Sequence, residues 1–207
     1  MAEQAMSEIP RDLRLATPAN WFDLDLNPST SAESIARLVE DRVGGGAEQA
    51  ENRREVVRML RKATVDAREQ EAIFASVLSD VIEGRPVAAS VIVSLAKDGS
   101  PAPGDTETRV GALEVRLAEP GGPIAGAATA TKELPGAGWS LRARRRVSIE
   151  PPGLEGHPVE VDNVQYFVPL PGSTDLVLLS FSTPNLGLAD AMAELFDAVA
   201  ESLQWRW

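Results

Sequence analysis

The chain contains no cysteine and only one histidine, His157. Without cysteine it can form no disulfide, no thiolate metal site and no cysteine nucleophile. With one histidine, a serine–histidine relay has a single candidate base, and any metal site must rely on carboxylates. His157 lies in a loop rich in glycine and proline, where we expect it to be exposed or packed within the loop.

Aromatic residues make up only 5% of the chain, so the core must consist mostly of Val, Leu, Ile and Ala. No apolar run approaches the roughly 18 residues of a membrane-spanning helix. Residues 1–10 are acidic and polar, and they lack the apolar segment of a secretory signal. We therefore expect a cytoplasmic protein with no membrane span.

Positive charge is in the minority, because 20 Lys and Arg residues face 31 Asp and Glu residues and the net charge is -11. Indiscriminate binding to nucleic acid or to an anionic membrane requires a positive potential. The sequence therefore predicts neither, although a local basic patch remains compatible with this charge.

Common catalytic and ligand motifs are also missing. The chain has no Gly-x-Ser-x-Gly, no Gly-x-x-x-x-Gly-Lys and no Gly-x-Gly-x-x-Gly after a strand. Asp23 and Asp25 could share one face of a strand as a carboxylate pair. The alternation around them places both on the polar side, which favours solvated side chains over general acid–base catalysis. We predict no catalytic residue, no metal site, no cofactor and no enzymatic activity.

What the chain does contain is clear periodicity. Alternating or Val/Ile-rich runs predict strands at residues 21–26, 72–82, 86–96, 127–134 and 139–149. The run at 72–82 could also continue the helix before it. Apolar residues at helical spacing predict helices at residues 30–43, ended by Gly44–Gly46, and at 48–69 and 106–118. The helix at 48–69 has a basic surface, interpreted as a solvated face paired with nearby acids, made of Arg53, Arg54, Arg58, Arg61 and Lys62.

The last fifty residues read as a complete folding unit. Two strand-like segments, residues 159–169 and 176–182, flank a Pro/Gly turn, and an amphipathic helix follows them. The sequence therefore predicts an α+β fold, with an antiparallel β-sheet flanked by helices and a C-terminal amphipathic helix. We expect residues 1–8 to form a flexible tail and residues 9–207 a single domain, because no linker is long enough to divide them.

The most distinctive feature is the arginine stripe, which we define as Arg142, Arg144 and Arg146 on one face of the strand at 139–149. Arg145 interrupts the opposite, apolar face and must snorkel, pair or mark a register shift. Three interpretations of the stripe are open. Its stems could lie under a helix whose acids meet the guanidinium groups, it could dock an acidic protein, or it could bind nucleic acid. The overall charge and the lack of interleaved aromatics disfavour the last.

The motif Pro18–Trp21 and the ending Tyr166–Pro169, Val177–Pro184 and Trp205 resemble those of the PsbP-like, or Mog-type, α/β/α sandwich. The whole chain also resembles a family of uncharacterised actinobacterial proteins. The resemblance covers roughly residues 9–205, and it implies an antiparallel sheet between helices. It also implies a protein-binding scaffold more often than a catalyst. Because the matching positions are structural, it transfers no functional residue.

The function predicted from these observations is that of a non-enzymatic protein-binding adaptor or chaperone-like accessory protein, with secretion among its candidate pathways. The predicted docking residues for its protein partner are Arg142, Arg144 and Arg146. One alternative is a structural or assembly subunit that self-associates through an edge strand or Trp207. Another is a small-ligand-binding protein or an enzyme of an unrecognised type.

Overall fold

The structure is a computed structural model that describes residues 9–43, 50–82, 84–97, 106–150, 156 and 158–207. The predicted tail at residues 1–8, the helix end at Gly44–Gly46 and the single histidine, His157, lie outside the described residues.

A seven-stranded sheet forms the centre of the fold, and every neighbouring pair of its strands is antiparallel. Across the sheet the strands are β2 (Trp21–Asp23), β3 (Ala72–Ile82), β4 (Arg85–Lys97), β8 (Asp175–Thr183), β7 (Val159–Pro169), β6 (Gly138–Ile149) and β5 (Ala128–Leu134). The hairpin of β3 and β4 and the final hairpin of β7 and β8 confirm the two predicted from the sequence. The strand predicted at residues 21–26 is shorter, because Asp25 and Asn27 accept hydrogen bonds from nearby backbone amides and turn the chain there.

Among the described residues, four α-helices pack on the sheet or on one another, close to the predicted positions. They are α1 (Ser31–Val43), α2 (Ala50–Glu69), α3 (Thr106–Leu117) and α4 (Ala189–Glu201). A 3-10 turn, Leu186–Leu188, leads into α4. The predicted α+β class, with an antiparallel sheet flanked by helices and a helix near the C-terminus, is confirmed.

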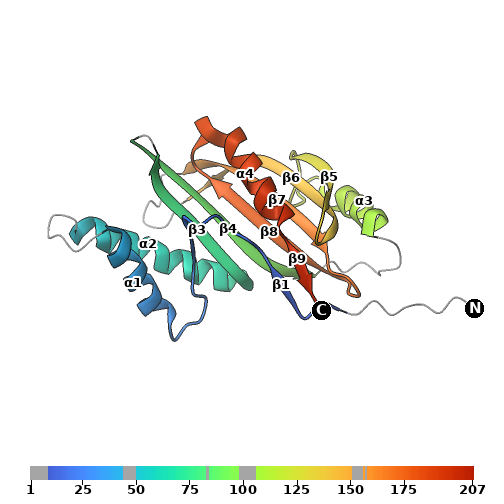
Figure 1. Cartoon of the computed structure of the whole chain (residues 1–207). Helices are drawn as coiled ribbons and strands as arrows, with labels where there is room; N and C mark the ends of the chain where they lie inside the picture. The colour runs from blue at the N-terminus through green and yellow to red at the C-terminus, as the bar shows by residue number, and fades with distance from the viewer. Residues whose placement is uncertain (1–8, 44–49, 83, 98–105, 151–155, 157) are drawn as a thin grey trace, which may run out of the picture.

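The helices divide the sheet into two differently covered faces. Helix α4 crosses one face, whereas α2 and α3 lie on the other face towards opposite edges (Figure 1). This arrangement follows from the period of two along each strand, which sends successive side chains to opposite faces. Each strand in the middle of the sheet therefore packs against α4 through apolar residues at alternate positions.

The face under α4 holds the largest apolar cluster. Phe196 of α4 stacks on Phe181 of β8, with ring centroids 5.1 Å apart, and meets Trp21 edge-on at 6.4 Å. Such pairs are worth about 0.5–1.5 kcal/mol each beyond the area they bury. The few aromatic residues of the chain thus concentrate where α4 meets the sheet.

The opposite face has two separate apolar clusters. Val110 and Leu113 of α3 pack on Leu141 and neighbouring residues of β6 and β7. At the other side, Ala67 of α2 packs on Ala75 of β3. The strands between these two clusters carry polar side chains on this face.

A small second sheet joins the two ends of the described chain. Strands β1 (Asp12–Arg14) and β9 (Gln204–Arg206) pair antiparallel, and we call this pair the terminal clasp (Figure 1). Trp205 is half-buried there, and its Nε1 donates a hydrogen bond to the carbonyl oxygen of Ala137 at 3.0 Å. Trp207 is 60% exposed. The sequence analysis missed both strands, because three residues are too few to show a period.

Replacing Gly136 by alanine should weaken the terminal clasp. A Cβ atom at this position would lie 2.5 Å from the carbonyl oxygen of Leu203, so the backbone must shift. We expect a loss of about 1–3 kcal/mol in the free energy of unfolding, measured by urea denaturation.

The matched control is Gly111→Ala in α3, where a Cβ atom would meet nothing within 4 Å. It should raise the free energy of unfolding by about 0.5–1 kcal/mol, since alanine favours helix. A Gly136→Ala variant as stable as the wild type would show that the backbone is not closely packed at this point.

Candidate functional site

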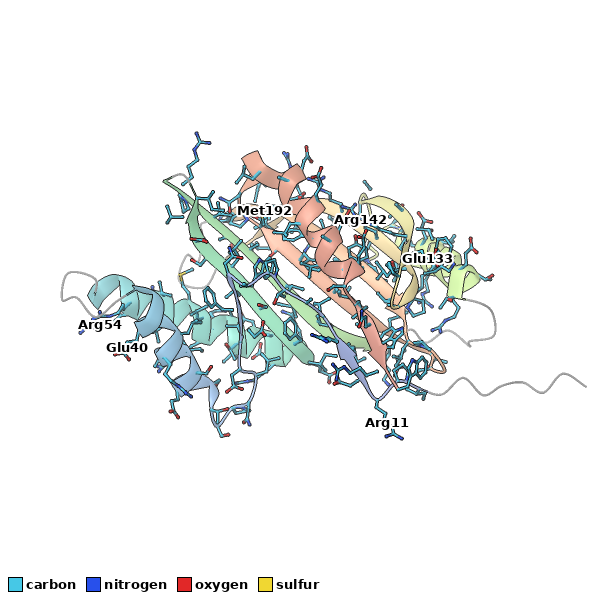
Figure 2. The ribbon with its side chains drawn as sticks, in the orientation of Figure 1. Arg11, Glu40, Arg54, Glu133, Arg142 and Met192 are labelled. Carbon is cyan, nitrogen blue, oxygen red and sulfur yellow. The ribbon has the colours of Figure 1, made fainter. Side chains whose placement is uncertain are left out.

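The arginine stripe lies on the face of β6 that α4 covers. Arg142 Nε is 2.8 Å from Asp197 Oδ1, and the hydroxyl of Tyr166 donates to the same oxygen at 2.6 Å (Figure 2 labels Arg142 beside α4). Lys132 of β5 also reaches α4, with its Nζ 3.3 Å from Asp197 Oδ2 and 3.0 Å from Glu201 Oε1. These contacts attach α4 to β5, β6 and β7.

Arg144 is also engaged within the chain, whereas Arg146 is exposed. The Nε of Arg144 is 2.9 Å from Asp162 Oδ2, and its NH2 is 2.9 Å from Asp190 Oδ1 of α4. Two of the three predicted docking residues therefore lie under the helix with acids around their guanidinium groups. This is the covered arrangement considered among the interpretations of the stripe. Partner docking by Arg142, Arg144 and Arg146 stays a prediction, and Arg146 is the member on the surface.

The electrostatics of this junction favour a structural role. Burial alone would raise the pKa of Asp197, but hydrogen bonds from Tyr166 and Arg142, with the positive charges of Arg142 and Lys132, lower it below its usual value. Burial raises the pKa of the Tyr166 hydroxyl, and the neighbouring carboxylate raises it further. Both groups keep their ordinary charge state at neutral pH, whereas an acid or base catalyst needs a pKa near the working pH.

Asp23 and Asp25 do not form an acid–base pair of the kind considered above. Asp23 is exposed at the end of β2, and Asp25 lies in the turn that follows. A side-chain hydrogen bond with Thr30, followed by one from the backbone of Asn27, lowers the pKa of Asp25. A general acid needs a raised pKa.

Two further features are absent from the described part of the chain. No group of three or more Asp, Glu or His side chains is placed to hold a metal ion. No described helix is both long and apolar enough to cross a membrane.

A cleft of about 710 Å³ is lined by residues of α1 and of the first half of α2. We call it the basic cleft, and its lining residues are Ala36, Val39, Glu40, Arg53, Arg54, Val57, Arg58 and Arg61. Val39 is buried and Val57 half-buried, so the floor is apolar, while Arg54 and Arg61 are exposed. Figure 2 labels Arg54 and Glu40 on the pair of helices α1 and α2, at the left of the picture.

The sequence predicts these arginines as a solvated helix face paired with nearby acids, which stays a prediction, and it does not predict the cleft. Their spacing offered a signal, because Arg54, Arg58 and Arg61 recur at helical spacing around Val57 and thus share a face with an apolar residue. The second wall, α1, could be placed only by the tertiary structure. The later part of α2 is occupied differently, since Leu60, Ala63 and Ala67 pack towards the sheet.

The uncovered part of the sheet between α2 and α3 is the third feature. We call it the polar band and define it by half-buried residues of four adjacent strands, Arg145 of β6, Asn163 and Gln165 of β7, Ser180 and Ser182 of β8, and Ser90 of β4. In the register of the sheet, Arg145 lies opposite Asn163, which lies opposite Ser182. The band is a continuous surface of amides, hydroxyls and one guanidinium.

Comparison with known proteins gives little. No protein-family model matches the chain, and no curated protein matches it significantly. Among solved structures, the chain is similar to LpqN, which is involved in cell envelope biogenesis of Mycobacterium tuberculosis. The two are 11% identical with a TM-score of 0.41, over 94% of this chain and 83% of LpqN. The resemblance to the PsbP-like family stays a prediction.

Replacing Asp197 by asparagine should destabilise the protein at neutral pH and change its response to acid. We expect a loss of about 1.5–3 kcal/mol at pH 7, the usual worth of hydrogen bonds to a charged group. Because folding lowers the pKa of Asp197, its contribution is fully present above the unfolded value of about 3.9 and is lost as the pH falls through the folded value. The difference between wild type and variant should therefore shrink below about pH 4.

The measurement is urea denaturation of both proteins across this pH range. The matched control is Asp190→Asn on the same helix, where the side chain is 94% exposed and the expected loss is below about 1 kcal/mol. A difference for Asp197→Asn that stays constant down to acid pH would contradict the lowered pKa.

Proposed function

We propose that this protein is a non-enzymatic adaptor or chaperone-like accessory protein that binds an acidic segment of a partner protein in the basic cleft. The observation that carries the proposal is one of charge. The chain has a net charge of -11, yet the described lining of this cleft contains four arginines and one glutamate. A concave basic surface attracts acidic partners, whereas the acidic surface of the rest of the protein repels them. An acidic partner is therefore directed to the cleft.

The mixture of side chains in the cleft suits a peptide segment. Arginine is enriched at protein interfaces because its planar guanidinium group binds carboxylates and its stem packs on apolar surface. From Arg53 to Arg61 the helix rises about 12 Å, which is about two helical turns. A partner segment of similar length can place carboxylates on the arginines and apolar side chains over Val39 and Val57.

This proposal moves the predicted docking surface away from the arginine stripe. Arg142 and Arg144 already have acids within the chain, so a partner that used them would compete with α4. Arg54 and Arg61 of the cleft are exposed. In this proposal the partner is a cytoplasmic protein, and its identity would also reveal the pathway, including whether secretion is involved.

Self-association is the second candidate function, and one observation favours it. Trp207 is 60% exposed beside the terminal clasp, and exposed tryptophan is common at interfaces. Sedimentation of the wild type beside Trp207→Ser over a range of concentrations separates this candidate from the first. A monomer at high concentration opposes self-association and leaves the adaptor proposal intact.

The experiment on the basic cleft uses three baits in affinity capture from the native cytoplasm: the wild type, Arg54→Glu/Arg61→Glu, and Arg11→Glu/Arg85→Glu. The third bait carries the same change of charge at exposed residues outside the cleft, and Figure 2 shows Arg11 far from Arg54. A protein captured by the wild type is then purified, and its affinity for each bait is measured at low and high salt.

We expect the cleft variant to bind at least about tenfold more weakly, which corresponds to about 1.4 kcal/mol, and the control variant to bind like the wild type. Binding of the wild type should weaken with salt, because exposed charges are screened. Equal affinity of the same partner for all three folded baits would place the interface outside the cleft and refute the proposal.

A further inference from the structure

Arg145 differs from the other arginines of its strand. Arg142 and Arg144 each have a carboxylate within 3 Å. Arg145 points to the opposite face, where its Nε is buried and has no hydrogen-bond partner. None of the ion pairs among the described residues involves Arg145.

An arginine in this position costs free energy. A buried donor without a partner loses its hydration and gains nothing in return, and the cost is greater when the group is charged. An apolar residue at position 145 would continue the pattern of Leu141, Ala143 and Val147 on this face. The chain instead places a guanidinium group there, and no ion pair among the described residues neutralises it, although the chain has more acids than bases. An arginine in this arrangement is a candidate to bind an external carboxylate or phosphate.

The neighbours of Arg145 supply hydrogen-bonding groups of neutral charge. Asn163 lies directly opposite Arg145, and its Nδ2 donates to the carbonyl oxygen of Phe181 at 2.9 Å, which holds the side chain in place. The hydroxyls of Ser90 and Ser182 bond to each other at 2.8 Å. Gln165 and Ser180 lie opposite each other in the next row. These positions form a fixed set of donors and acceptors on a rigid sheet.

The chemistry of the band selects among ligands. A guanidinium group binds carboxylate or phosphate through two parallel hydrogen bonds. Side-chain amides and hydroxyls can form hydrogen bonds with the hydroxyls of a ligand. The serine side chains are small, so a flat ligand ring can lie close to the strands. The band contains no aromatic residue, so it offers no platform on which a nucleobase could stack. A sugar-like anion fits this set better than a nucleotide does.

We propose that the polar band binds a small polyhydroxylated anion, with the carboxylate or phosphate of the ligand on Arg145 and its hydroxyls on Asn163, Gln165 and Ser180. This site is independent of the basic cleft, because the two lie on different elements and share no residue. It would make the protein a ligand-binding one in addition to its proposed role as an adaptor.

The test follows the side-chain amide signals of Asn163 and Gln165 by NMR in the full-length, isotopically labelled protein. The probes are glucose 6-phosphate, glucuronate and, as the neutral control, glucose. We expect at least one of the two anions to shift these signals in a saturable way at millimolar concentration, and glucose to leave them unchanged. A response to glucose 6-phosphate alone assigns a phosphate ligand, and a response to glucuronate alone assigns a carboxylate.

Arg145→Gln should weaken the binding at least about tenfold. Arg146→Gln is the matched control, since the next residue of the same strand is exposed on the opposite face and its loss should leave the affinity unchanged. Gln165→Ala, which keeps Arg145, should weaken the binding of the sugar anion and serves as the decisive variant should Arg145→Gln fail to fold. The absence of a shift with both anions, a similar shift with glucose, or an unchanged affinity in Arg145→Gln or Gln165→Ala would overturn the proposal.

Discussion

The carboxylate of Asp197 is the contact on which the arrangement of the molecule depends. One of its oxygens takes hydrogen bonds from Arg142 and Tyr166, which lie opposite each other on β6 and β7. A helix tethered at that point has little freedom to slide, and Phe196, one residue earlier, is held against Phe181. With α4 seated there, the chain after it leads directly to β9 and the terminal clasp. One ionic contact thus orders a largely apolar interface.

The position of α4 also decides which charges can serve an external partner. Covering the arginine stripe converts Arg142 and Arg144 from surface groups into parts of the core, because the acids of α4 and β7 neutralise them. Basic charge on a concave surface is found in the basic cleft, where Arg54 and Arg61 of α2 are exposed. A short helical hairpin that projects from a rigid sheet presents arginines on a surface that the core does not need.

The face of the sheet opposite α4 carries polar side chains in its middle strands. Because α2 and α3 lie near opposite edges, no described helix covers the middle strands on this side, and an apolar surface there would be exposed to water. Serine, asparagine and glutamine satisfy that requirement without any ligand. Arg145 is the residue that this explanation does not cover, since a neutral polar residue would suffice at its position. It is therefore the residue that turns a solvated surface into a candidate binding site.

The sequence by itself determined the class of fold. The alternation around Val164–Val168 and the helical spacing from Leu188 to Leu203 identified the final hairpin and α4, because period and burial are properties of a local segment. It also placed Arg142 and Arg145 on opposite faces of β6. Only the tertiary structure decided what each face meets, since Asp197 is 55 residues from Arg142 in the chain, and the walls of the basic cleft come from two different helices. The clasp of β1 and β9 depends on pairing across almost the whole chain, and such a contact leaves no periodic trace in three residues.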